Sequence, residues 1–322
     1  MSKPYVFITR TLPETIVEPF RSSLDIHMWP KTEEPVERST LLAEANKANA
    51  IITMLSDHID EEVLENAPRL QAIANLAVGY DNIDINLAHE HGITVTNTPD
   101  VLTETTADLT FGLLMATARR LLEASDYVRE DKWSNWAPLL LAGQDVHHKT
   151  IGIVGMGRIG KAVAHRAQGF HMNILYHNRS HDEEAEQQLG ATYASFDELL
   201  EHSDFVVCLA PLTEQTKHMF HKASFQRMKS SAIFVNASRG ANVVEEDLYE
   251  ALVKGQIAGA GLDVFEEEPI HNDHPLLSLS QVVALPHIGS ATIETRQDMM
   301  KLCLENIQLV LDNKQPKTKV TI

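Results

Sequence analysis

The sequence has little of what several protein classes require. Only two of its 322 residues are cysteine, Cys208 and Cys303, and they lie far apart and outside any C-x-x-C pattern. A disulfide framework and a cysteine-based zinc site are therefore not expected, and a reducing cytoplasm is the natural compartment. No stretch approaches the roughly 18 uninterrupted apolar residues of a membrane-spanning helix. The opening MSKPYVFITR also lacks the apolar run of a signal peptide.

Positive charge is scarce as well. The chain has 27 Lys and Arg residues against 45 Asp and Glu residues, which gives a formal net charge of −18 at pH 7. Such an acidic surface repels nucleic acid and anionic lipid over most of its area, so we expect neither as a partner. The 16 histidines show no H-E-x-x-H or similar spacing, and no metal site is expected.

The sequence does contain a long alternation of short apolar runs and helical patterns. Its apolar fraction of 43% and charged fraction of 22% are typical of a globular protein with a packed core. The alternation predicts βαβ units, and its two series predict an α/β fold with two doubly wound parallel sheets. Strands are predicted at 5–9, 25–29, 50–55, 70–77 and 93–96 in the first series, and at 150–154, 173–177, 192–194, 205–209, 232–235, 259–264 and 282–285 in the second.

Two longer helical patterns, 103–122 and 291–312, follow the two series. A domain boundary is predicted near Thr98–Pro99, because proline disfavours helix in the residue before it. The last helix comes after the second series and is free to return to the first sheet, which periodicity alone does not decide.

The strongest single motif is a glycine-rich turn. Gly155, Gly157 and Gly160 form G-x-G-x-x-G directly after a predicted strand and before the amphipathic stretch KAVAHRAQGF. In that context the first glycine permits a tight turn, the second lets backbone approach a pyrophosphate, and the third lets the helix pack on the strand. The N-terminus of the helix stabilises the anion. The motif therefore predicts a dinucleotide site, which also includes Arg158 and Ile159.

The end of the next predicted strand indicates which dinucleotide is bound. NAD sites usually place Asp or Glu there for the ribose hydroxyls. Here the residues are Asn178, Arg179 and Ser180, which supply a guanidinium and small hydrogen-bonding groups but no carboxylate. These groups suit a 2′-phosphate and predict a preference for NADP(H). The alternatives are that Arg179 is a solvated surface residue and that NAD(H) is also accepted.

Three further segments each follow a predicted strand, and ligands of open α/β sheets bind at that edge. The segments are VNASRG at 235–240, GLDVFEEEP at 261–269 and LPHIGSAT at 285–292. Together with the glycine-rich turn, they resemble the D-isomer-specific 2-hydroxyacid dehydrogenase family. The resemblance covers nearly the whole chain, and within the family it is strongest to the glyoxylate and hydroxypyruvate reductases.

The resemblance implies that Arg239, Glu268 and His287 are catalytic. The chemistry of these side chains is consistent with that role, since histidine is the natural proton donor near neutral pH. A carboxylate beside it favours the imidazolium and fixes the ring, and an arginine holds a substrate carboxylate through two parallel hydrogen bonds. Taken singly, each residue has a structural alternative: a satisfied core histidine, a surface ion pair, or one acid of the run 266–268.

Further contacts are implied by the same resemblance. The backbone N–H groups of Val78 and Gly79, within NLAVGYD, are expected to hold the substrate carboxylate with Arg239. Leu55 is expected to line the substrate pocket, unless it only packs in the core. The implied cofactor contacts are Thr106, Pro211, Thr216, Ala237, Gly289 and Asp263, the last near the nicotinamide ribose.

In the reductase branch, the segment that matches KWSNWAP extends toward a partner subunit. Trp133 and Trp136 lie in this segment, and Trp136 is expected to reach the partner's substrate site; local packing is the alternative. The resemblance therefore implies a homodimer, formed through the cofactor domain.

The resemblance finally implies the domain plan and the activity. Residues 1–98 plus 287–322 are expected to form a flavodoxin-like substrate domain, and 99–286 a Rossmann cofactor domain. The expected reaction is NADPH-preferring reduction of glyoxylate or hydroxypyruvate to a D-2-hydroxy acid, with His287 as proton donor. The alternatives are an NAD-dependent dehydrogenase of the phosphoglycerate or D-lactate type, and a dinucleotide-sensing protein like the family's transcriptional corepressors.

Overall fold

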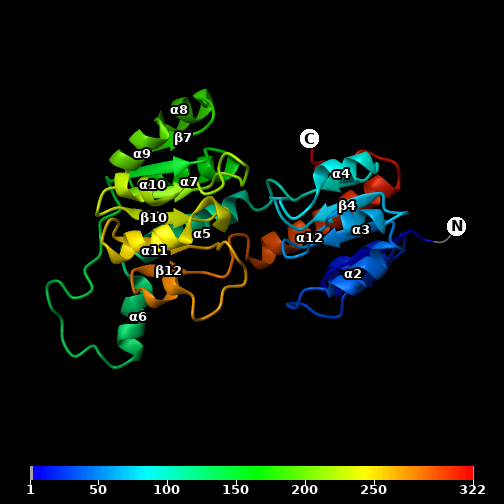
Figure 1. Ribbon diagram of the computed structural model, residues 1–322, viewed down its shortest axis with the longest axis horizontal. Helices are drawn as coiled ribbons and strands as arrows, with labels where there is room; N and C mark the ends of the chain where they lie inside the picture. Colours follow the sequence, from blue (N-terminus) through cyan, green and yellow to red (C-terminus); the bar gives the residue numbers. More distant parts are fainter. Residues whose placement is uncertain (1–2, 322) are drawn as a thin grey trace. The chain divides into compact units, whose positions relative to one another are not determined.

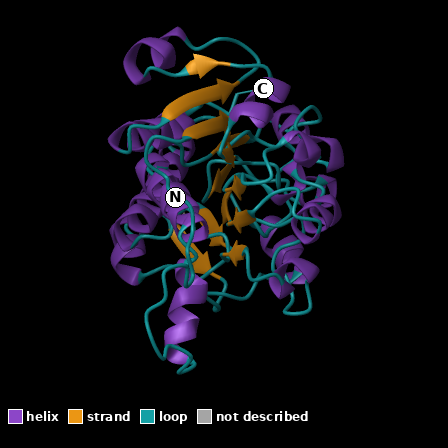
Figure 2. Ribbon diagram, turned by 90° about the vertical axis from the view of Figure 1, so that its left-hand side faces the viewer, coloured by secondary structure: helices purple, strands orange, loops and turns teal. Residues whose placement is uncertain are grey.

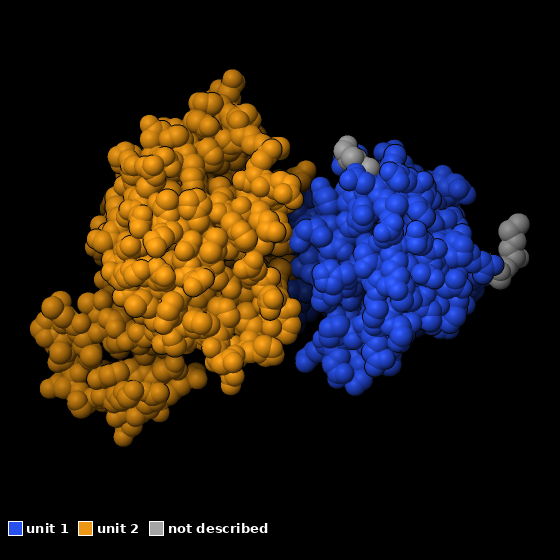
Figure 3. All heavy atoms as spheres, viewed as in Figure 1, with its two compact units in different colours: residues 1–102, 291–322 blue, residues 103–290 orange. Residues whose placement is uncertain are grey.

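A computed structural model describes residues 3–321 of the chain. They form two compact units, coloured separately in Figure 3. Unit 1 holds the residues up to Leu102 and those from Ala291 onward, and unit 2 holds Thr103–Ser290. The chain passes from unit 1 to unit 2 between residues 102 and 103 and returns between 290 and 291. The predicted boundaries were 98/99 and 286/287, so His287 belongs to unit 2. None of the helices in the described part of the chain is long and apolar enough to cross a membrane.

Unit 1 is built on one parallel sheet, whose strands within the described residues run in the order β2-β1-β3-β4-β5. This is the flavodoxin-like order, with the switch in strand order between β1 and β3. The strands are β1 (Tyr5–Ile8), β2 (Asp25–Met28), β3 (Ala50–Thr53), β4 (Ala72–Asn75) and β5 (Thr94–Thr96). The connecting helices are α1 (Glu14–Val17), the 3-10 helix η1 (Glu18–Phe20), α2 (Arg38–Ala45), α3 (Glu61–Glu65) and α4 (Ile85–Glu90).

The C-terminal helix α12 (Ile293–Leu311) returns to the sheet of unit 1. The thiol of Cys303, on this helix, contacts the carbonyl oxygen of Asn75 at the end of β4, with an S···O distance of 3.7 Å. Beyond the helix, the N–H of Val320 donates to the carbonyl of Val95 in β5 at 2.9 Å. The helix that periodicity left unassigned therefore packs on the first sheet.

Unit 2 is also built on one parallel sheet, with the order β12-β11-β10-β9-β6-β7-β8 among the described strands. This is the Rossmann order with one further strand, and its switch lies between β6 and β9. The strands are β6 (Thr150–Val154), β7 (Asn173–His177), β8 (Thr192–Tyr193), β9 (Phe205–Cys208), β10 (Ile233–Asn236), β11 (Gly259–Leu262) and β12 (Val282–Ala284). The helices are α5 (Thr103–Ala118), α6 (Leu121–Arg129), α7 (Arg158–Gly169), α8 (Glu183–Leu189), α9 (Phe196–His202), α10 (Lys222–Arg227) and α11 (Glu245–Val253), with the 3-10 helices η2 (Gly240–Asn242) and η3 (Pro275–Ser278).

Helices cover both faces of the unit 2 sheet, because its central strands are apolar on both faces (Figures 1 and 2). In β9, Phe205 and Val207 pack in the core that contains α5 and α7. The alternate residues Val206 and Cys208 pack in the core that contains α9, α10 and α11. Successive side chains of a strand point to opposite faces, so a fully apolar strand requires a helical layer on each side.

The helix predicted at 103–122 is interrupted, which corrects the sequence-based expectation. Arg120 has a φ of 50°, and α5 and α6 end and begin on either side of it. The segment that ends in Gln144 crosses the end of α5, where the N–H of Gln144 donates to the carbonyl of Ala118 at 2.8 Å. A Cβ on Gly143 would lie 2.2 Å from that carbonyl oxygen, so the crossing requires glycine. The apolar pattern continues through the break, which is why periodicity did not reveal it.

Candidate functional site

The glycine-rich turn lies at the carboxyl end of β6, beside the switch point of the unit 2 sheet. Gly155 has a φ of 102°, and a Cβ there would lie 2.5 Å from the backbone N of Ala210, so the turn requires glycine at this position. A Cβ on Gly160 would lie 2.3 Å from the carbonyl oxygen of Gly155. A Cβ on Gly157 would meet nothing within 4 Å. The fold therefore needs Gly155 and Gly160, whereas the space over Gly157 at the start of α7 is open for a ligand.

Asn178, which follows β7, braces this turn. Its Oδ1 accepts a hydrogen bond from the backbone N–H of Met156 at 2.8 Å. Arg179 and Ser180 are exposed, and Arg179 forms no ion pair within residues 3–321. The structure thus separates the three residues that the sequence grouped: Asn178 supports the turn, while Arg179 and Ser180 face outward beside it.

Glu268 and His287 lie side by side in unit 2. The Nδ1 of His287 is 2.7 Å from Oε2 of Glu268, and Oε1 of Glu268 accepts from the N–H of Phe265 at 3.0 Å. Burial raises the pKa of the Glu268 carboxyl, but the hydrogen bond from His287 and the positive charges of His287 and Arg239 outweigh it and lower this pKa below its usual value. Both side chains keep some solvent access, with 28% exposure for His287 and 35% for Glu268.

Asp263 holds the turn that carries His287. The backbone N–H of His287 donates to the carbonyl of Asp263 at 2.9 Å, and the N–H of Ile288 donates to its carboxylate at 2.8 Å. The N–H of Gly289 also bonds this carboxylate. His287 has a φ of 53°, so these three bonds hold a left-handed residue in place. Burial is the main reason that the pKa of Asp263 is raised.

Two of the expected cofactor contacts gather beside this carboxylate. A Cβ on Gly289 would lie 3.2 Å from Oδ2 of Asp263 and 3.3 Å from Cγ2 of Thr106. Thr106, Asp263 and Gly289 therefore meet at one place at the carboxyl edge of the unit 2 sheet, although they are far apart in the sequence.

Arg239 is presented by a short turn after β10. The side-chain amide of Asn236 donates to the carbonyl of Arg239 at 2.9 Å, and its oxygen accepts from the N–H of Ser238 at 3.1 Å. The hydroxyl of Ser238 in turn donates to the carbonyl of Ala210, which follows β9. Asn236 and Ser238 thus tie Arg239 to the neighbouring strand end, a role that the sequence motif did not reveal.

Gly240 joins the Arg239 turn to the segment that carries Glu268. A Cβ on Gly240 would lie 1.8 Å from the carbonyl carbon of Phe265 and 2.2 Å from the N of Glu266, closer than any real Cβ contact. The two backbone segments can approach this closely only with glycine at 240. The structure therefore brings together the Arg, Glu and His that the sequence grouped.

The predicted substrate residues of unit 1 follow two neighbouring strands. Leu55 is half-buried after β3, and Val78 and Gly79 are half-buried after β4. The side-chain amide of Asn97 donates to the carbonyl of Val78 at 2.8 Å, and that of Asn75 donates to the carbonyl of Gly79 at 2.7 Å. The first bond fixes the Val78–Gly79 peptide, which carries the N–H of Gly79, and the second fixes the peptide that follows it.

Of the remaining predicted residues, Arg158 and Ile159 begin helix α7, and the others lie on loops of unit 2. The hydroxyl of Thr216 donates to the carbonyl of Pro211 at 2.5 Å and closes the loop after β9, while Ala237 is half-buried after β10. Trp133 and Trp136 lie on the loop after α6 and are 59% and 75% exposed. Both tryptophans are therefore largely exposed in this chain.

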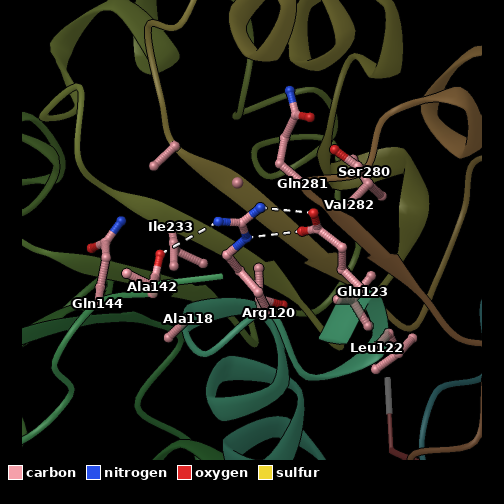
Figure 4. A pocket seen from close by; sticks show the side chains of 15 residues that line it. Ala118, Arg120, Leu122, Glu123, Ala142, Gln144, Ile233, Ser280, Gln281 and Val282 are labelled. Carbon is pink, nitrogen blue, oxygen red and sulfur yellow. Dashed lines mark hydrogen bonds and ion pairs between the residues drawn. The ribbon is translucent and has the colours of Figure 1, made fainter. Parts of the chain in front are cut away.

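A hollow of about 310 Å³ lies at the opposite edge of unit 2 (Figure 4). It is lined by the starts of β10, β11 and β12 and by the chain around Arg120, whose guanidinium donates to both carboxylate oxygens of Glu123 at 2.8 and 2.7 Å. Open parallel sheets bind ligands at the carboxyl ends of their strands. This hollow is therefore not part of the candidate site.

The Rossmann-type sheet, its glycine-rich turn and the Arg–Glu–His edge together define an NAD(P)-dependent oxidoreductase. Sequence comparison agrees, since the model for the D-isomer specific 2-hydroxyacid dehydrogenase, NAD binding domain, matches residues 111–289. A glyoxylate reductase of Thermococcus gammatolerans is 49% identical, over 99% of this chain and 96% of its own length. The chain belongs to the D-isomer-specific 2-hydroxyacid dehydrogenase family.

Solved structures are similar along the whole chain. A protein of Thermus thermophilus superimposes with a TM-score of 0.92 at 41% identity, over 98% of this chain and 100% of the other. An NADPH-dependent glyoxylate/hydroxypyruvate reductase of Sinorhizobium meliloti, crystallised with NADP and malonate, gives a TM-score of 0.86 at 32% identity. That match covers 99% of this chain and 97% of the reductase.

Two glycines of the turn, Gly157 and Gly160, should respond differently to replacement by alanine. Gly157→Ala should change the free energy of unfolding by less than about 1 kcal/mol, yet weaken NADPH binding at least about tenfold, because its Cβ would occupy the ligand's space. Gly160→Ala should lower stability by about 1–3 kcal/mol through overpacking. Urea unfolding and titration of NADPH fluorescence measure the two effects. Wild-type affinity in Gly157→Ala would show that no pyrophosphate approaches this residue.

Proposed function

We propose that this protein is a reductase of small 2-oxo acids that prefers NADPH, with glyoxylate and hydroxypyruvate as substrates. The observation that carries the proposal is the His287–Glu268 pair, held beside Arg239 by the close contact at Gly240. The names of the Thermococcus and Sinorhizobium relatives support the same substrates. Turnover of glyoxylate with NADPH is the direct test of this proposal.

The residues of the turn fit a dinucleotide. The open space over Gly157 lies at the N-terminus of α7, where backbone N–H groups and the helix dipole stabilise a pyrophosphate. Thr106, Asp263 and Gly289 would hold the nicotinamide end, and Pro211, Thr216 and Ala237 would form the wall between. When bound, the reduced nicotinamide supplies a hydride.

His287 supplies the proton in this proposal. Its Nδ1 is committed to Glu268, so Nε2 is the atom that faces the substrate and protonates the oxygen formed from the carbonyl. The ionised carboxylate of Glu268 fixes the ring orientation and stabilises the imidazolium before the proton leaves. Arg239 supplies positive charge for the substrate carboxylate and for the polarised carbonyl oxygen.

Unit 1 offers a separate set of donors for a carboxylate. The carbonyl of Val78 is held by Asn97 and that of Gly79 by Asn75, which fixes the backbone on both sides of Gly79. The N–H groups of Val78 and Gly79 would act on the ligand. Leu55, half-buried after β3, is the third residue of unit 1 that we propose for substrate binding.

The removal of one proton donor should separate chemistry from binding. His287→Ala should lower kcat for glyoxylate by at least about 100-fold while NADPH binding is retained, because general acid catalysis is lost without a phosphate contact. Glu268→Gln should move the basic limb of the pH–kcat profile to lower pH. The lowered pKa of Glu268 keeps this carboxylate ionised along the basic limb. The Gln variant therefore removes the charge that favours the imidazolium of His287. A near wild-type kcat for His287→Ala from pH 5 to 8 would exclude the assigned role.

The 2′-phosphate site should be testable at Arg179. A charge-assisted hydrogen bond contributes roughly 1.5–3 kcal/mol, or about 10- to 150-fold in affinity. Arg179→Ala should therefore lower kcat/KM with NADPH far more than with NADH, and adding Asn178→Asp should reverse the preference, since Asp keeps the acceptor for Met156. The control Asn178→Ala should weaken both cofactors alike, because it releases the turn. A wild type that prefers NADH would show that this turn has been misread.

We also propose that the protein forms a homodimer in the cytoplasm, through α6 and the loop after it. This arm projects from unit 2 in Figure 1 and exposes a series of apolar side chains. They are Leu121, Leu122, Val128, Trp133, Trp136, Leu139 and Leu140. An apolar surface of this kind is typical of an interface, and Trp136 would extend from it toward the partner's substrate site.

Two valines of nearly equal exposure provide the test. Val128, in α6, is 56% exposed, and Val253, at the end of α11, is 57% exposed. Val128→Lys should shift the mass measured by light scattering from dimer toward monomer, because it places a charge in an apolar interface. Val253→Lys should leave the dimer intact. A monomeric wild type, or equal effects of both changes, would exclude this interface.

A further inference from the structure

Glu245, the first residue of α11, bonds both flanks of the loop that carries Glu268. Its Oε1 accepts a hydrogen bond from the backbone N–H of Glu266 at 2.9 Å. Its Oε2 lies 3.1 Å from Nε2 of His274, which follows the same loop. One carboxylate therefore fixes the loop at two points, one on each side of Glu268.

The surroundings of His274 indicate how the pair is protonated. Its side chain is 23% exposed and that of Glu245 15%. Nδ1 of His274 is buried and has no hydrogen-bond partner among the described residues. A proton on Nδ1 would be buried without an acceptor, which is costly. We therefore assign the proton to Nε2, where it is donated to Glu245.

The path from this pair to the candidate catalytic pair is short. The ring of His274 meets the ring of Phe265 edge to face, with the centroids 6.0 Å apart. The N–H of Phe265 donates to Oε1 of Glu268, whose other oxygen meets His287. Glu245 thus sets the position of Phe265–Glu266, and that segment sets the position of the Glu268 carboxylate.

We propose that Glu245 and His274 are positioning residues for the Glu268–His287 pair, acting through the Phe265–Glu266 backbone. This inference rests on the proposed function in one respect: Glu268 and His287 are taken as the catalytic groups that are being positioned. Charged groups near the loop include Arg239, Asp263 and His218, whose Nε2 lies 3.2 Å from Oε1 of Glu266 at the surface. The loop itself also carries Glu267, His271 and Asp273.

Helix-terminal charge alone does not account for Glu245. Glu246 and Asp247 are also acidic residues in the first turn of α11 and interact similarly with its dipole. Glu246 is exposed, whereas Glu245 is directed into the loop. Glu246→Ala is therefore a matched control, with the same loss of charge in the same helical turn.

The experiment compares Glu245→Ala, Glu245→Gln and Glu246→Ala in glyoxylate reduction with NADPH across pH 5–9. Glu245→Ala should lower kcat by about tenfold or more, with KM nearly unchanged, because the proton donor is misplaced. The basic limb of its pH–kcat profile should move to lower pH, as a misplaced Glu268 supports the imidazolium less. Gln keeps an acceptor for the Glu266 N–H but turns its NH2 group toward the protonated Nε2 of His274, so it should restore only part of kcat and of the shift in the limb. Glu246→Ala should match wild type.

An unmoved limb in a folded Glu245→Ala, or an equal effect of Glu246→Ala, would overturn the proposal. If Glu245→Ala does not fold, as judged by urea unfolding, His274→Ala makes the same test, since it removes the second anchor and leaves Glu266 bonded. In His274→Ala the basic limb of the pH–kcat profile should move part of the way to lower pH. An unmoved limb in this variant would overturn the positioning role of Glu245 and His274.

A second measurement keeps this inference separate from the proposed activity. The side-chain nitrogen resonances of His287, assigned by loss of signal in His287→Gln, report its hydrogen bond to Glu268 without any substrate. They should shift in Glu245→Ala and stay in place in Glu246→Ala, even if wild type does not reduce glyoxylate. Unshifted resonances in Glu245→Ala would overturn the positioning role, whereas an inactive wild type with shifted resonances would overturn the proposed function alone.

Discussion

The contact between Gly240 and the Phe265–Glu266 peptide is the constraint on which the candidate site depends. Parallel strands bring their carboxyl ends to one edge, but that alone leaves the following loops free to diverge. At Gly240 the backbone of one loop lies directly on the backbone of the next, with no room for a Cβ. Arg239 precedes Gly240, and Glu268 lies two residues beyond Glu266, so main chain rather than flexible side chains holds the two segments in a fixed relation.

Several polar side chains extend this arrangement along the sheet edge. Asn236 holds the Arg239 turn, Asp263 holds the His287 turn, and Asn178 holds the glycine-rich turn. In each case a short side chain at a strand end accepts from, or donates to, the backbone of a loop. Backbone groups in loops must be paired when they are buried. The same bonds that satisfy them also fix the groups that would meet cofactor and substrate.

The sequence predicted much of this fold, because strand periodicity and the glycine spacing are local signals. The sequence located the strand before the glycine-rich turn and the next strand along the chain. It also grouped Arg239, Glu268 and His287 by the strand ends that carry them. The supports were not predictable in the same way. Asn178, Asp263 and Glu245 act through backbone N–H groups that are 22, 25 and 21 residues distant in sequence, and no short pattern records such pairs. The break at Arg120 was likewise invisible, since it depends on a crossing segment that ends at Gln144.

Because the protein is acidic, the places where positive side chains gather matter for the binding of anions. With a net charge of −18, an anionic cofactor and an anionic substrate can bind only where positive charge is concentrated. Lys161, in the first turns of α7, is not available for this, because it pairs with Asp182 at 3.0 Å and Glu184 at 2.6 Å. Arg179 is exposed, and it has no ion pair within the described residues. In the proposed NADPH site, Arg179 would therefore meet the 2′-phosphate at the end of β7. The N-terminus of α7, where Arg158 also lies, would meet the pyrophosphate.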